Sequence, residues 1–129
     1  MKATRKVPAA KLVVVIDDDA FVLEATGSLL RSWGFQVATA ESYGEAMDRL
    51  GNQGRRPDLI VCDYRLSEGA TGTDAIARLR KAFEIPALLI SGDGSSPQSN
   101  ADTAAYRLLH KPVNAETFRA VLGASVLQC

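Results

Sequence analysis

Five polar side chains follow directly after short apolar runs, and their chemical types together suit a site for phosphate. Asp17 and Asp18 follow the run KLVVVI, Asp63 follows LIVC, and two further residues, Ser91 and Lys111, follow ALLI and LLH. Carboxylates bind divalent cations, whereas a hydroxyl group and an ammonium group bind anionic oxygens. The residue types therefore predict a site that combines a metal ion with a phosphoryl group.

The aspartates need a cation if they lie together, because clustered carboxylates repel one another. Mg²⁺ prefers carboxylate oxygen and retained water, and it is usually held by one or two protein carboxylates with substrate phosphate. We therefore expect Asp18 and Asp63 to bind the metal directly and Asp17 to act through water. Phosphoryl transfer depends mainly on positioning and charge neutralisation, and a carboxylate can itself be the nucleophile, forming an aspartyl phosphate.

The apolar runs that carry these residues alternate with segments of helical period along the whole chain. Strands are predicted over residues 11–16, 35–40, 59–62, 87–90 and 107–110. Helices are predicted over residues 20–33, 42–50 and 95–105, from residue 114 to the C-terminus, and around Ile76, Leu79 and Phe83. This alternation is typical of a doubly wound α/β fold, with helices on both faces of a parallel sheet. Such sheets bind ligands at the carboxyl ends of their strands, where the five polar residues would meet.

Local signals set the ends of the helices. Asp19 is expected to be the N-cap of the first helix, and Gly34 follows its last residue. Ser42 and Glu45 have the spacing of a capping box before the second helix. The buried stripe of the first helix is expected to be formed by Val22, Leu29, Leu30 and Trp33.

Length and composition predict one domain that folds alone. The chain has 129 residues, of which 47% are hydrophobic. Its 15 basic and 15 acidic residues balance, which removes the composition argument for a nucleic-acid-binding module. The locally basic residues 1–10 are expected to be a solvated tail, followed by a domain over residues 11–127.

Two cysteines, Cys62 and Cys129, give neither a disulfide framework nor metal-ligand spacing, which favours the reducing cytoplasm. Cys62 is expected to be a small buried hydrophobe. No apolar run approaches the roughly 18 residues of a membrane helix, and KLVVVI is too short for a signal-peptide core. We therefore expect a cytoplasmic protein without membrane insertion.

Common nucleotide-binding and hydrolase motifs do not occur in the sequence. It contains neither G-x-x-x-x-G-K-[ST] nor G-x-G-x-x-G, so nucleotide-binding interpretations of the fold lose their main support. The only histidine, His110, is expected to be a structural strand residue, which argues against a Ser-His-Asp site.

Four motifs taken together resemble a known family. These are VVVIDDD at 13–19, PDLIVCDYRL at 57–66, LLIS at 88–91 and LLHKPV at 108–113. In this order they resemble the receiver domain of two-component response regulators, in the version found within or beside hybrid sensor histidine kinases. The resemblance covers residues 11–127 and implies a flavodoxin-like, five-stranded parallel sheet with strand order 2-1-3-4-5.

The resemblance also implies a role for each polar residue. Asp63 would be the phospho-acceptor, Ser91 the switch hydroxyl and Lys111 the phosphate-pairing lysine. The metal, Mg²⁺ or Mn²⁺, would be held by Asp17, Asp18, Asp63 and the backbone carbonyl of Arg65. Such a domain assists its own phosphorylation and dephosphorylation without being a turnover enzyme. Its phosphodonor would be a sensor histidine kinase or a histidine phosphotransfer protein.

Two positions depart from the family pattern and leave other hypotheses open. Ser67 stands where the family usually has proline, and Leu108 stands where many receivers have a tyrosine or phenylalanine that rotates on activation. A second hypothesis is therefore a receiver-like interaction module that does not switch. A third is a metal-dependent phosphohydrolase, since such enzymes also place aspartates at strand ends.

Overall fold

The computed structural model describes residues 11–54, 56–66, 71–91, 107–110 and 114–127. Its strands are β2 (Leu12–Ile16), β3 (Gln36–Ala40), β4 (Leu59–Asp63), β5 (Ala87–Ser91) and β6 (Arg107–His110). Its helices are α1 (Ala20–Ser32), α2 (Tyr43–Gln53), α3 (Gly72–Ala82) and α4 (Ala115–Leu127). The helix predicted over residues 95–105 lies outside the described residues.

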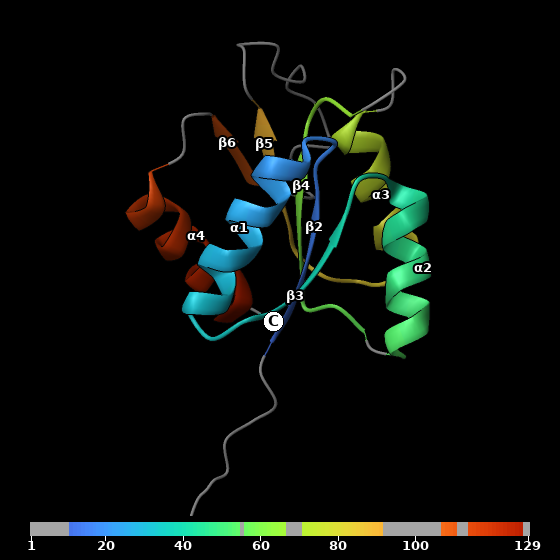
Figure 1. Cartoon of the computed structure of the whole chain (residues 1–129), viewed down its shortest axis with the longest axis horizontal. Coiled ribbons are helices and arrows are strands. Elements are labelled where there is room, and N and C mark those ends of the chain that lie inside the picture. The colour runs from blue at the N-terminus through green and yellow to red at the C-terminus, as the bar shows by residue number, and fades with distance from the viewer. Residues whose placement is uncertain (1–10, 55, 67–70, 92–106, 111–113, 128–129) are drawn as a thin grey trace, which may run out of the picture.

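The strands form one parallel sheet in the order β3-β2-β4-β5-β6. The predicted doubly wound α/β sheet and the order of its first four strands are confirmed, and β6 pairs with β5 at the outer edge. Helices α1 and α4 lie on one side of the sheet, and α2 and α3 lie on the other (Figure 1). The central strands are therefore covered on both faces.

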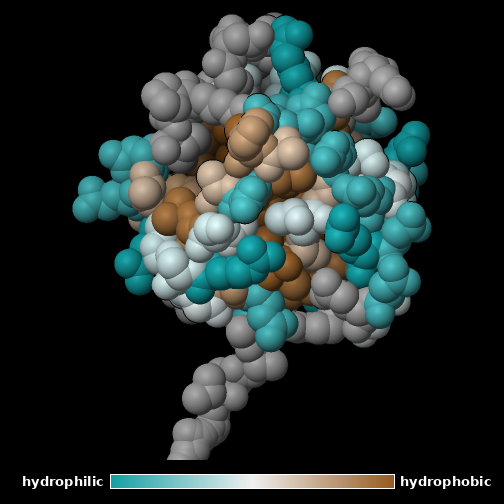
Figure 2. Space-filling view, in the orientation of Figure 1, coloured by the Kyte–Doolittle hydropathy of each residue, from teal (hydrophilic) through white to brown (hydrophobic). Residues whose placement is uncertain are grey.

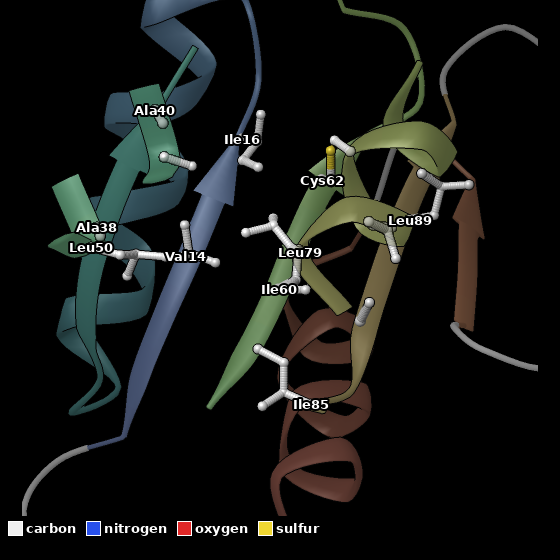
Figure 3. Packing of buried hydrophobic residues seen from close by; sticks show 14 of the residues in the cluster. Val14, Ile16, Ala38, Ala40, Leu50, Ile60, Cys62, Leu79, Ile85 and Leu89 are labelled. Carbon is white, nitrogen blue, oxygen red and sulfur yellow. The ribbon is translucent and has the colours of Figure 1, made fainter. Parts of the chain in front are cut away.

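Two layers of apolar side chains separate the sheet from its helices. In β2 the side chains alternate between them, so Val14 and Ile16 pack in the layer under α2 and α3, whereas Val13 and Val15 pack under α1 and α4. Figure 3 shows the first layer, in which Leu50 of α2 lies near Val14 and Leu79 of α3 lies near β4. All five residues of β2 are buried, which explains why its sequence shows no polar alternation.

Helix α2 follows its predicted amphipathic pattern. Ala46 and Leu50 are buried, whereas Asp48 and Arg49 are exposed on the other side. Figure 2 shows a mainly hydrophilic surface over this helix. Ser42 Oγ accepts the Glu45 N–H at 3.1 Å, as the capping-box spacing predicts. The helix is thus fixed by burial on one face and by a hydrogen bond at its start.

The prediction for the buried face of α1 is wrong at Val22. The structure buries Leu23, Gly27 and Leu30, and Val22 is only partly buried. These three residues are spaced four and three apart and lie on one face of a helix. Gly27 breaks the apolar pattern of that face in the sequence, but its Cα approaches β3, where an added Cβ would lie 3.4 Å from Thr39 Cγ2.

Helix α3 contains Ile76 and Leu79 of its predicted stripe but ends at Ala82, so Phe83 is its C-cap and not part of the helix. Phe83 still donates its N–H to Leu79 O at 2.8 Å, but its own backbone is extended at φ −134° and ψ 122°. Its carbonyl accepts the Ile85 N–H at 3.0 Å, which turns the chain towards β5. The side chain nevertheless packs against the core layer under α2 and α3. An apolar residue just past a helix end can thus imitate a further helical position.

Candidate functional site

Three carboxylates come together at the carboxyl ends of the two central strands. One oxygen from each of Asp17, Asp18 and Asp63 lies within 4.8 Å of the others. Ile16 and Cys62 are partners in the register of β2 and β4, so Asp17 and Asp63, which follow them, lie side by side at the ends of these strands. The predicted gathering of the three aspartates is therefore confirmed.

Asp17 is held in place by both its backbone and its side chain. Its N–H donates to the carbonyl of Ala40 at 3.1 Å, and its Oδ1 accepts the N–H of Asp19 at 2.9 Å. The residue is 6% exposed, whereas Asp18 is exposed and Asp63 is partly buried. The cluster thus has one fixed, buried member and two members that solvent can reach.

The third aspartate of the triplet has a different role. Asp19 Oδ1 accepts the N–H of Phe21 at 3.0 Å and the N–H of Val22 at 3.4 Å. It is the N-cap of α1, as predicted, and its backbone is extended there. A carboxylate in this position satisfies backbone donors that the helix leaves unpaired. Asp19 therefore caps α1 and is not a member of the cluster formed by Asp17, Asp18 and Asp63.

The donor set of the cluster fits a hard divalent cation. Mg²⁺ and Mn²⁺ both prefer oxygen ligands, and all three groups offer carboxylate oxygen. The three oxygens lie within 4.8 Å of one another, which is close enough for one ion to be shared among them. Like charges at this spacing oppose one another, and a cation between them removes that opposition.

Cys62 lies next to the cluster but is chemically protected. Its side chain is buried, and its Sγ donates to the carbonyl of Asp63 at 3.4 Å. Burial raises the pKa of the Cys62 thiol far above its usual range, and the nearby charges of Asp63 and Asp17 raise it further. The thiol therefore stays protonated and unreactive, in agreement with its predicted role as a small buried hydrophobe.

Ser91 is the last residue of β5 and lies beside the cluster in the strand register. Ile90 pairs with Asp63, so Ser91 is one position beyond the partner of that aspartate. It is 1% exposed, and within the described part of the chain its Oγ has no hydrogen-bond partner. A buried hydroxyl without a partner costs about 1–3 kcal/mol. A polar ligand that reached this oxygen would recover that cost.

The remaining predicted residues are only partly covered by the structure. Lys111 and Ser67 lie outside the described residues. His110, which directly precedes Lys111, is in register with Ser91. The backbone of Leu108 belongs to β6 and pairs with Leu89. The roles of Ser91, Lys111 and the Arg65 carbonyl thus stay predictions.

The segment after Asp63 contains a feature that the sequence reasoning missed. Arg65 and Thr71 form an isolated antiparallel bridge, and the N–H of Gly72 donates to Tyr64 O at 2.6 Å. Thr71 caps α3, with its Oγ1 accepting the Asp74 N–H at 3.3 Å. A threonine three positions before an aspartate is a helix-start signal that could have located this end of α3.

The clustered carboxylates of this doubly wound parallel sheet lie at the carboxyl ends of its strands, which is where α/β domains of this class bind their ligands. The sequence matches the model of the response regulator receiver domain over residues 13–123, and the chain belongs to this family. As a receiver domain of two-component signalling it is a phosphoryl acceptor and not a turnover enzyme. Within the described residues, no helix is long and apolar enough to cross a membrane.

Curated relatives are full-length regulators that this chain matches in part. It is 33% identical over 116 residues to the transcriptional regulatory protein ZraR of Escherichia coli, covering 85% of this chain and 25% of that protein. It is 31% identical over 117 residues to KdpE of Mycobacterium tuberculosis, covering 89% and 50%. The Phyllosphere-induced regulator PhyR of Methylorubrum extorquens is 30% identical over 80 residues, covering 61% and 30%. The chain thus spans a quarter to a half of the length of these relatives.

Solved structures share the fold over nearly the whole chain. A receiver domain protein from Clostridium thermocellum superposes with a TM-score of 0.78 at 24% identity, covering 92% of this chain and 95% of that one. A chemotaxis protein from Vibrio cholerae gives a TM-score of 0.78 at 25% identity, covering 91% and 99%. The α/β fold of the receiver family is therefore present here.

Proposed function

We propose that this chain accepts a phosphoryl group on Asp63 within a two-component phosphorelay, with Mg²⁺ or Mn²⁺ at the acidic cluster. One observation carries the proposal, namely the gathering of Asp17, Asp18 and Asp63 within 4.8 Å at the carboxyl edge of a receiver sheet. Of the three, Asp63 is the one on β4, between the strand of the buried Asp17 and the strand of Ser91.

In the proposed transfer, a carboxylate oxygen of Asp63 attacks the phosphorus of a phosphohistidine on the donor. The P–O bond forms as the P–N bond breaks, and the electron pair of that bond stays on the imidazole nitrogen. The divalent ion, when bound, offsets the negative charge of the carboxylates and of the phosphoryl oxygens. Asp17 is fixed by the Asp19 N–H and keeps the cluster in place, whereas Asp18 is exposed and Asp63 is partly buried.

After transfer, the buried hydroxyl of Ser91 would donate to one phosphoryl oxygen and the ammonium group of Lys111 would pair with another. The lack of a described partner for Ser91 Oγ supports this role, because phosphate would supply the missing acceptor. These contacts of Ser91 and Lys111 with the phosphoryl group would favour one conformation of a signalling surface near β5 and β6. The Arg65 carbonyl would complete the metal ligands.

The donor is proposed to be a sensor histidine kinase or a histidine phosphotransfer protein, and the site of action the cytoplasm. We retain residues 11–127 as the receiver domain and residues 1–10 as a tail. The relatives described above are named as regulators, so they do not support the more specific prediction that this receiver belongs within or beside a hybrid sensor histidine kinase. The phosphohydrolase hypothesis is not retained, because the chain belongs to the receiver family, whose members are phosphoryl acceptors.

The test is phosphorylation of the purified chain by phosphoramidate, a small donor that contains a P–N bond. With Mg²⁺ present, we expect the mass of the protein to rise by one phosphoryl group, and the change to disappear when Mg²⁺ is chelated. Asp63→Asn should abolish the uptake. Asp48→Asn is the matched control because Asp48 is exposed on α2. Undiminished uptake by Asp63→Asn would refute the proposed acceptor.

A non-switching module remains the second candidate, motivated by Leu108 in place of an aromatic residue. It would still take up the phosphoryl group, but its amide resonances in β5, β6 and α4 would not change on addition of beryllofluoride, which mimics the acyl phosphate. Saturable changes in those elements would instead support a switching receiver.

A further inference from the structure

Gly72, the first residue of α3, lies unusually close to the backbone of Asp63. A Cβ added at this position would overlap the carbonyl oxygen of Asp63 and would lie 2.9 Å from its carbonyl carbon and 2.7 Å from Leu89 Cδ1. Added Cβ atoms at Gly51 and Gly54 would meet nothing within 4 Å. Among the described glycines, positive φ is found at Gly34 and Gly54, so Gly72 is required by space and not by conformation.

The contact falls on the peptide group that sets the direction of Asp63. On one side of that peptide, the N–H of Tyr64 donates to the carbonyl of Ile90 at 2.8 Å, which ties it to β5. On the other side, the carbonyl oxygen of Asp63 accepts the Cys62 thiol at 3.4 Å and occupies the space that a Cβ added at Gly72 would need. The peptide is therefore bonded to β5 at its N–H and has room for its carbonyl only because residue Gly72 lacks a side chain. A shift of the carbonyl would turn the Cα of Asp63, which carries the carboxylate.

The next peptide groups extend the same attachment to Arg65. The carbonyl of Tyr64 accepts the N–H of Gly72 at 2.6 Å, and Arg65 pairs with Thr71. Thr71 and Gly72 are thus bound to the two residues that directly follow the acceptor, Tyr64 and Arg65, and the carbonyl of Arg65 is proposed to bind the metal. The start of α3 therefore fixes the backbone of the segment that directly follows Asp63.

An alanine at this position cannot be accommodated by side-chain movement alone. Leu89 Cδ1 is the end of a flexible side chain and can move, but the carbonyl of Asp63 is backbone. Non-bonded carbon–oxygen contacts are rarely closer than about 3.3 Å, so α3 or the Asp63 peptide would shift by roughly 1 Å. Either shift strains the Gly72–Tyr64 hydrogen bond or redirects the carboxylate.

We infer that Gly72 is a positioning residue for phosphoryl transfer, because its missing side chain lets α3 hold the Asp63 peptide and the Arg65 backbone in the reactive arrangement. The inference rests on the proposed function of Asp63. A misplacement of about 1 Å in reacting groups typically lowers a rate by roughly 100-fold. We therefore expect Gly72→Ala to lower phosphoryl uptake from phosphoramidate by about that factor at saturating Mg²⁺.

The experiment measures the uptake rate and the affinity for beryllofluoride in the wild-type chain, in Gly72→Ala and in three further variants. Gly51→Ala is the matched control, because its Cβ enters open space, and it should keep the wild-type rate. Leu30→Ala lowers stability on the opposite face of the sheet and should also keep the rate. Gly72→Ala combined with Leu89→Ala relieves the side-chain contact but not the backbone contact, so its uptake should stay about 100-fold low.

Three outcomes overturn the inference. The first is a wild-type rate in Gly72→Ala, and the second is recovery of the rate in the double variant, which would assign the defect to crowding at Leu89. The third is a fall in Leu30→Ala as large as that in Gly72→Ala, which would assign it to lost stability. If wild type itself takes up no phosphoryl group while remaining folded, the proposed function fails, and the inference fails with it.

A measurement on the wild-type chain keeps the inference testable if Gly72→Ala does not fold. Because the N–H of Gly72 donates to the residue after Asp63, its amide resonance should shift on addition of Mg²⁺ and beryllofluoride, with the same midpoint as the Asp63 amide. The Gly51 amide should stay unchanged. A Gly72 resonance that does not move while Asp63 saturates would overturn the inference.

Discussion

Replacing Ser91 with alanine should make the domain more stable without ligand and less responsive to a phosphoryl analogue. The Ser91 side chain is 1% exposed, and its Oγ lacks a hydrogen-bond partner within the residues that the structure describes. Leaving a buried hydroxyl unsatisfied costs about 1–3 kcal/mol, which alanine avoids while filling nearly the same space. We expect Ser91→Ala to raise the free energy of unfolding by about 1 kcal/mol, or the Tm by roughly 4 °C.

The effect should reverse when the phosphoryl analogue is bound. Beryllofluoride with Mg²⁺ at 100 times its Kd stabilises a folded domain by about 2.7 kcal/mol. A hydrogen bond from Ser91 to the charged analogue is worth about 1.5–3 kcal/mol, so its loss weakens binding by roughly 10- to 100-fold. At the same analogue concentration, the alanine variant should gain less than about 1.5 kcal/mol.

Urea unfolding with and without the analogue measures both quantities. Trp33 reports the transition, because its ring packs edge-to-face with Phe118 at a centroid distance of 5.9 Å, and this contact is lost on unfolding. Ser91→Thr is the control, since it keeps the hydroxyl and should keep the response to the analogue. The reasoning is refuted if Ser91→Ala is less stable than wild type without ligand and gains as much stability from beryllofluoride.

Two further predictions concern the acidic cluster and the thiol beside it. Mg²⁺ should raise the free energy of unfolding of wild type, because it binds the folded form. Asp17→Asn should reduce this gain, whereas Asp48→Asn should not. Equal gains for both variants in urea titrations would contradict a metal site at Asp17. The pKa of the buried Cys62 thiol is raised from 9.0, so above pH 9.0 the unfolded chain loses a proton that the folded chain keeps. The free energy of unfolding should therefore fall by about 1.4 kcal/mol per pH unit in that range. Cys62→Ala should lack this part of the fall. Identical slopes of unfolding free energy against pH in the two proteins would show that Cys62 does not cause it.

The strands and the clustered aspartates were predictable because both depend on short-range patterns. A strand covered on both faces is a continuous apolar run, as in β2, and the run stops where the backbone leaves the sheet. In parallel sheets all such ends lie at one edge, which brought Asp17 and Asp63 together in the prediction. The capping roles of Asp19 and Ser42 followed from equally local rules.

The errors arose where a residue's role depends on a distant part of the chain. Gly27 lies on the buried face of α1 because β3 passes close to it, which no periodicity count includes. Phe83 is apolar because it packs under α2 and α3, not because the helix continues to it. Gly72 is required by the approach of α3 to the carbonyl of Asp63, and a single sequence carries no signal for that proximity.

The two functions of Asp19 place a constraint on how this sequence can vary. Its carboxylate caps α1, whereas its backbone N–H, which every residue except proline possesses, holds the side chain of Asp17. Serine, threonine or asparagine could replace the cap and leave that backbone hydrogen bond intact. Over evolutionary time, the third position of the acidic triplet is therefore free to exchange among capping residues, whereas proline would damage both the helix start and the acidic cluster at once.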